Sequence, residues 1–258
     1  MRLMKRILSA AAVLALSASL LVGCSSGTAS SVPVSASSAA ESTVSSVEET
    51  ASSAVDENEA AAAQLLNDLT GSYQELWPVI LADEYKQTWL DDCTALVGED
   101  NAEAAFEKLS SMVTGDVYGE DAVKAYANGG GAYFCGFTNS LAILTFDGET
   151  STISGTDKDG NVLFSHTYHY IGMEPVHELY EFESDDADSG EFTYFFLAPD
   201  TSAETYHIEF RYGSDAEALS QYDAGEYAYW VASGISTDCD QTMIDNCIEL
   251  FCTENLAG

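Results

Sequence analysis

The spacing of apolar residues along the chain changes its period near residue 129. Before this point, apolar and aromatic residues recur every three or four positions, which predicts amphipathic helices. We expect these helices at 60–69, 83–96, 99–112 and 120–127. Three consecutive glycines, Gly129 to Gly131, follow directly and predict the end of the helical part.

After the glycines, apolar and polar residues alternate, which predicts strands. We expect them at 141–146, 150–155, 162–170, 176–182, 191–197 and 206–212. Short strands at even spacing, joined by turn signals such as Asp147-Gly148, predict an up-and-down antiparallel sheet that closes into a barrel. A helix at 215–222, a loop with Gly225 and Gly234, and a last helix at 237–251, capped by Ser236 or Thr237, complete the chain. The predicted fold class is mainly β with flanking helices (α+β).

The alternation also assigns the faces of two strands that carry histidines. In 206–212 one face is apolar, and the other carries Thr205, His207, Glu209 and Arg211. One interpretation of this polar face is a solvated surface on which Glu209 and Arg211 pair weakly. In 162–170, His169 lies on the polar face and His166 on the aromatic one. We therefore expect His166 to be a hydrogen-bonded core residue, and His177, beside Glu178, to lie at the surface.

The N-terminus has the pattern of a lipoprotein signal peptide. Basic residues at positions 2, 5 and 6 precede an apolar run at 7–22, which ends in Leu21-Val22-Gly23-Cys24. The run is short for a membrane span, so we predict cleavage after residue 23 and a lipid on Cys24; an uncleaved anchor helix would give the same localisation. Residues 24–59, rich in Ser, Ala and Glu and without an aromatic residue, predict a disordered tether. The sequence thus predicts a folded domain at 60–258, outside the cytoplasm, that contacts the bacterial cell membrane only through its lipid anchor.

Composition excludes several function classes. The formal net charge of −35 repels nucleic acid and anionic lipid. The chain has no GxSxG, HExxH or phosphate-binding glycine loop and no Ser/His/Asp signature, so we do not expect an enzyme. The acidic turn at 185–188 lacks the spacing of a calcium loop and is expected to be a solvated turn.

Five cysteines follow Cys24, namely Cys93, Cys135, Cys239, Cys247 and Cys252. An exported domain with five thiols can form at most two disulfides. Cys247 and Cys252 are five residues apart on a predicted helix and do not share a face, so each bonds elsewhere or one is free. The spacing leaves the connectivity open.

Seven segments stand out by their order and spacing along about 190 residues. They are 69–74 with Trp77-Pro78, 185–194, Ala198-Pro199, Tyr206-His207-Ile208, Gly213-Ser214-Asp215, Tyr229-Trp230 and 233–236. Together they resemble the ZinT family of lipocalin-like zinc- and cadmium-binding domains, which are also fused to AdcA-type zinc lipoproteins. The resemblance implies an antiparallel lipocalin-like (calycin) barrel.

The resemblance also implies a metal function. In the family, zinc is held chiefly by three histidines, of which His207 matches one; Thr205 and Phe195 stand at or near the places of the others. We therefore predict a rebuilt zinc site from His207, Glu209, His169 and Glu204, because zinc needs about four N, S or O ligands. By resemblance, the protein would capture zinc, or cadmium, and could deliver it to a zinc ABC importer. The alternative is a barrel that binds a small organic ligand or a protein partner without metal.

Overall fold

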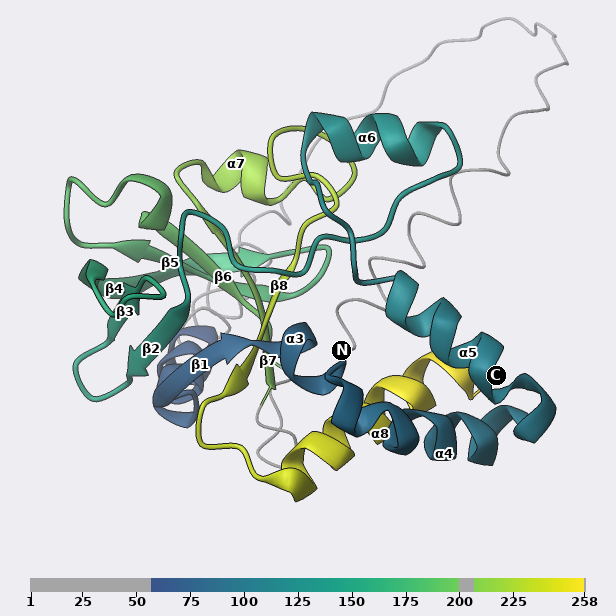
Figure 1. Ribbon diagram of the computed structural model, residues 1–258. Helices are drawn as coiled ribbons and strands as arrows, with labels where there is room; N and C mark the ends of the chain where they lie inside the picture. Colours follow the sequence, from purple (N-terminus) through teal and green to yellow (C-terminus); the bar gives the residue numbers. More distant parts are fainter. Residues whose placement is uncertain (1–56, 200–206, 258) are drawn as a thin grey trace, which may run out of the picture.

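The computed structural model describes residues 57–199 and 207–257 (Figure 1). The predicted signal peptide, Cys24, most of the tether and Glu204 lie outside the described residues. Within the described part, no helix combines the length and the hydropathy that crossing a bilayer requires.

Eight antiparallel strands form a closed barrel in which each strand pairs with its neighbours in the sequence. They are β1 (Gly71–Glu75), β2 (Ile143–Asp147), β3 (Thr152–Thr156), β4 (Val162–Glu174), β5 (Leu179–Ser184), β6 (Tyr194–Leu197), β7 (His207–Gly213) and β8 (Ala232–Ser236). The pairing of Tyr73 in β1 with Ser236 in β8 closes the barrel. The predicted up-and-down antiparallel barrel is therefore confirmed, and it is the architecture that lipocalins have.

Two of the eight strands, β1 and β8, are absent from the sequence prediction. β1 lies inside the stretch predicted to be helical, and β8 in the stretch predicted as a loop. β1 is only five residues long and buries one of them, Tyr73, so it has too few positions to show a period. In β8 four of five residues are buried, so polar alternation is lost; a side chain at Gly234 would press on Ile208, which explains the glycine.

Aromatic rings fill the barrel interior. Phe195 of β6 lies with its ring centroid 6.0 Å from that of Phe164 and 5.4 Å from that of Tyr168, both on β4. Phe210 of β7 continues the cluster, with its ring 5.4 Å from that of Phe137. Because β4 and β6 are not neighbours in the sheet, the contacts of Phe195 with Phe164 and Tyr168 run across the barrel and show which face of these strands points inward.

Helices cover one end and one side of the barrel (Figure 1). A helix at 57–68 precedes β1, and α3 (Leu76–Ile80) follows it. The 3-10 turns are η1 (Asp83–Tyr85) and η2 (Gly190–Phe192). The other helices are α4 (Lys86–Val97), α5 (Glu99–Ser111), α6 (Glu120–Ala127), α7 (Ala216–Leu219) and α8 (Gln241–Leu256).

The helices α3, α4 and α8 pack together through aromatic side chains. The ring of Phe251 in α8 lies 4.8 Å from that of Trp77 and 5.8 Å from that of Trp89, whose Nε1 donates to the carbonyl of Ile80 at 2.7 Å. The expected cap at Ser236 or Thr237 is wrong. The carboxylate of Asp240 caps α8 by accepting from the Met243 amide at 3.0 Å, because residues 232–236 are used by β8.

Candidate functional site

The polar face of β7 is buried rather than solvated. His207 and Glu209 are each 2% exposed and Arg211 is fully buried. Ile208, on the opposite face of the same strand, is 2% exposed. The expectation of a solvated face with a weak Glu209–Arg211 surface pair is therefore wrong. Alternation shows which residues share a face, but the chain that covers that face comes from elsewhere in the sequence.

Arg211 binds the segment that covers this face of β7, residues 219–227. Its guanidinium donates to the backbone carbonyls of Leu219, Gln221 and Tyr227, and it lies 4.2 Å from the ring centroid of Tyr222. These groups all belong to α7 and the loop after it. Arg211 therefore fixes the path of residues 219–227 against the outer face of β7.

His207 is a buried imidazole. Burial lowers the pKa of His207 well below its ordinary value, so the ring is neutral at physiological pH. A neutral imidazole has a nitrogen lone pair and can act as a metal ligand. Of the predicted ligands, His207 is the one whose state best suits this chemistry.

Glu209 lies on the same face as His207, two residues further along β7, and it places negative charge near two thiols. Burial raises the pKa of Cys135 well above its ordinary value, and the Glu209 carboxylate raises it further. The pKa of Cys247 in α8 rises to about 12, again mainly through burial, with Glu209 contributing. Both thiols are thus protonated at neutral pH and are poor metal ligands as they stand.

His169 lies on a different surface from His207. It is on β4, which β5 and β6 separate from β7 in the barrel, and its side chain is 52% exposed. Its Nδ1 is 2.7 Å from the Asp185 carboxylate, and Glu183 lies 4.0 Å from its Nε2. The structure does not bring His169 to His207, and across residues 57–199 and 207–257 it shows no group of three or more His, Cys, Asp or Glu side chains that could hold a metal ion.

The two other histidines are themselves buried or partly buried. His166 is partly buried among aromatic rings and its Nδ1 lies 2.7 Å from the carboxylate of Asp186, so the expected hydrogen bond is present, but its partner is exposed rather than in the core. His177 was expected at the surface and is instead 7% exposed. The Glu174 carboxylate accepts hydrogen bonds from the amides of Val176 and His177 and so stabilises a turn at these residues. Because of this turn, β5 begins at residue 179 rather than at the expected residue 176.

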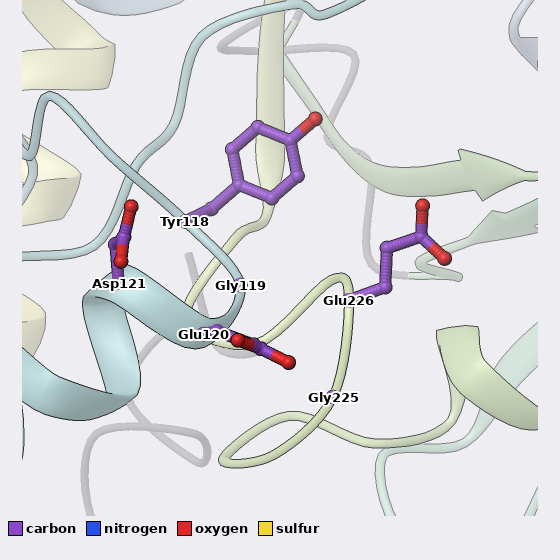
Figure 2. Close-up of a pocket in the computed structure, with 6 residues that line it drawn as sticks. All are labelled: Tyr118, Gly119, Glu120, Asp121, Gly225 and Glu226. Atoms are coloured by element: carbon purple, nitrogen blue, oxygen red, sulfur yellow. The ribbon is translucent and has the colours of Figure 1, made fainter.

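A cavity of about 510 Å³ lies outside the barrel, where the start of α6 meets the loop at 225–226 (Figure 2). It is lined by Tyr118, Gly119, Glu120, Asp121, Gly225 and Glu226. The Tyr118 ring stacks on that of Phe134, with centroids 5.6 Å apart, and lies tilted against that of Trp230 at 5.5 Å. Figure 2 shows Glu226 on the loop that faces the start of α6, so acidic side chains from two segments border one space.

Sequence reasoning missed this cavity because its walls are about a hundred residues apart. The Gly119 amide donates to the Ala228 carbonyl at 2.8 Å, and a side chain at Gly119 would collide with the Glu226 carbonyl. The one local signal was an aromatic-glycine-acidic sequence, Tyr118-Gly119-Glu120, at the start of a helix. Burial raises the pKa of Tyr118, and the charges of Glu191 and Glu226 raise it further, so its hydroxyl stays protonated.

Fold and site together define the chain as a small antiparallel barrel with a helical layer and an acidic exterior. No model of a known protein family and no curated protein matches the sequence. Among solved structures, it is similar to the Zn(II)-bound ZinT-like domain of Streptococcus pneumoniae AdcA, with 16% identity, a TM-score of 0.43, and coverage of 70% of this chain and 87% of that domain. It is also similar to Zn(II)-bound AdcA from the same organism, with 14% identity and a TM-score of 0.41, covering 70% of this chain and 34% of that one. At these values, neither similarity assigns a ligand to this chain.

Proposed function

We propose that this chain is an extracytoplasmic, lipid-anchored binding protein that captures a divalent metal ion, zinc or cadmium, with His207 as its nitrogen ligand. The observation that carries the proposal is the buried, neutral imidazole of His207 on the outer face of β7. The localisation rests on the sequence pattern that ends at Cys24. Delivery of the metal to an importer in the same membrane is part of this proposal.

The ligand set proposed here is smaller than the one that the sequence predicted. His207 and Glu209 share a buried face of β7 and are the two ligands that we propose from the described residues. Glu204 precedes His207 by three residues, outside the described part, and stays in the set as a proposal. We leave out His169, because it is exposed on β4 and already bonded to Asp185.

Calorimetric titration of the metal-stripped chain with zinc tests the proposal. We expect one zinc per chain with micromolar affinity or tighter, and at least a tenfold loss of affinity in His207→Ala, since each missing ligand weakens a site of few ligands. His169→Ala is the matched control and should bind as the unmodified chain does. Circular dichroism and a second variant, His207→Gln, separate loss of a ligand from loss of the fold. Zinc binding that is absent, or that survives in both His207 variants, would refute metal capture at this site.

A second function, capture of an organic ligand or protein segment without metal, is favoured by the cavity beside Tyr118. Its acidic walls and its aromatic ring suit an ammonium or guanidinium group, because carboxylates attract the charge and the ring face adds a cation–π contact. The strong negative charge of the chain favours the same ligands at longer range.

Titration with Nα-acetyl-lysine amide in the presence of a chelator distinguishes this function from metal capture. We expect Tyr118→Ala and Glu226→Gln to weaken binding several-fold, whereas Glu217→Gln, an exposed carboxylate on α7, should not change it. If the probe does not bind, or if Glu217→Gln weakens binding as much as Glu226→Gln does, the cavity is not a cation-binding site.

A further inference from the structure

Two buried cysteines from distant parts of the sequence lie in contact where α4 packs against α8. The Sγ atoms of Cys93 in α4 and Cys252 in α8 are 3.9 Å apart, and both side chains are fully buried. We propose that Cys93 and Cys252 form a disulfide when the chain folds in an oxidising compartment. Phe251, next to Cys252 in α8, packs against Trp89 of α4 with ring centroids 5.8 Å apart, so aromatic contacts join the same two helices.

In the folded chain, Cys93 and Cys252 are two thiols that the structure places in contact. All five cysteines of the described residues are present as free thiols. Cys135 and Cys247 are buried near Glu209, on the outer side of β7. The choice of pairing, which the spacing of cysteines in the sequence leaves open, is thus decided by the docking of α4 on α8.

The geometry requires a modest change. A disulfide has an S–S bond of about 2.0 Å, so the two sulfurs must approach by roughly 2 Å. Rotation of the Cys side chains about χ1 and a small shift of the two helices can supply this. No other side chain stands between the two atoms at 3.9 Å, which is a van der Waals contact.

The chemistry needs an external oxidant, which we take to be a small disulfide such as oxidised glutathione. One cysteine thiolate attacks the oxidant and forms a mixed disulfide, releasing one reduced thiol. The second cysteine thiolate then attacks the protein sulfur of this mixed disulfide and releases the second reduced thiol. The protein loses two electrons and two protons, and both protons end on the two released thiols.

Timing follows from burial. Burial raises the pKa of Cys93, and it raises that of Cys252 still further, so neither forms a thiolate readily once α4 and α8 have closed. The exchange therefore occurs during folding, before the helices seal. The bond then joins residues 159 positions apart and restricts the unfolded chain, which stabilises the folded one.

The test is to refold the chain with chelator in a mixture of oxidised and reduced glutathione, then unfold it, alkylate free thiols and map the peptides by mass spectrometry. We expect one species in which the peptides that contain Cys93 and Cys252 are linked, and in which Cys135, Cys239 and Cys247 are alkylated. Alkylation of both Cys93 and Cys252, or a different pairing, would overturn the proposal. This experiment depends neither on export nor on metal. The disulfide can therefore be absent while the proposed metal binding holds, and the disulfide can form while the chain binds no metal.

Thermal unfolding supplies a second readout. For the oxidised chain we expect dithiothreitol to lower Tm by roughly 5–15 °C, as for a disulfide that closes a long loop. Cys252→Ser should have no such dependence on dithiothreitol, whereas Cys247→Ser, which also changes a buried thiol of α8, should keep it. A dependence on dithiothreitol that persists in Cys252→Ser contradicts the assignment.

Discussion

Strands β4 and β7 both alternate apolar and polar residues, yet the polar outer face is exposed on β4 and buried on β7. On β4 the outer residues Ser165, Thr167 and His169 are exposed, and His169 pairs with Asp185 in solvent. On β7 the outer residues His207, Glu209 and Arg211 are buried as deeply as the inner ones. A histidine or a carboxylate therefore has a low cost on β4 and a high one on β7, where burial must be offset by specific contacts.

This difference shows on which strand a polar residue requires a structural or functional explanation. Charged residues on an open sheet face need no explanation beyond solubility, because water solvates them. Charged residues on the covered face of β7 are retained although apolar residues would pack there at lower cost. Arg211 has a structural reason, since it binds the 219–227 segment. His207, a buried and neutral imidazole on the same face as Glu209, is the residue on which we base the proposed metal site.

The largest effect should come from removing the charge of Arg211. In Arg211→Met, three carbonyls that now accept from the guanidinium lose their donor inside the protein. We expect a loss of about 3 kcal/mol or more in the free energy of unfolding. Urea denaturation measures it, with Lys158→Met, at an exposed site between β3 and β4, as the control that should change stability by less than about 0.5 kcal/mol. If Arg211→Met lowers the free energy of unfolding as little as the control does, the hydrogen bonds from Arg211 to residues 219–227 do not stabilise the fold.

A smaller effect on stability is expected at Glu174, the buried last residue of β4, where the chain turns toward β5. Burial raises the pKa of Glu174, but hydrogen bonds from His177 and Val176 outweigh it, and the net pKa lies below the ordinary value of 4.5. Because the pKa is lower in the folded state, this stabilisation is present above about pH 4.5 and is lost as the pH falls through the folded pKa.

Glu174→Gln should therefore lower stability by about 1–2 kcal/mol at pH 7 and flatten its decrease in acid. Urea denaturation at a series of pH values between 7 and 3 measures both effects. Glu178→Gln, in the same turn, is the comparison variant. If Glu174→Gln follows the unmodified chain at every pH, the carboxylate is not bound as the structure shows.

The smallest effect should be at His169. His169→Ala removes an exposed pair with Asp185 and should change stability by less than about 0.5 kcal/mol. The measurement is the urea midpoint at low salt and at 0.5 M salt. A loss above 1 kcal/mol would make the outer face of β4 resemble that of β7 and remove the contrast between them.

Much of the fold follows from local pattern. Helix α6 was expected at 120–127 and is observed there, because a glycine precedes it and Gly129 to Gly131 follow it. Strands β2, β3, β4 and β7 lie within a few residues of their expected positions, because each has several alternating residues. The site was less predictable: His207 was named from a resemblance, and neither its burial nor the separation of His169 from it could be derived from spacing.

The sequence by itself determined the period of each element, the faces of the strands and the acidic character of the chain, since these depend on residues a few positions apart. Only the tertiary structure decided that β1 and β8 close the barrel, that the outer face of β7 is covered, that Tyr118 meets Glu226, and that Cys93 meets Cys252. Each of these depends on contacts between segments that are far apart in the sequence. The physical reason is that burial is a property of two surfaces, and the sequence of one segment specifies only its own.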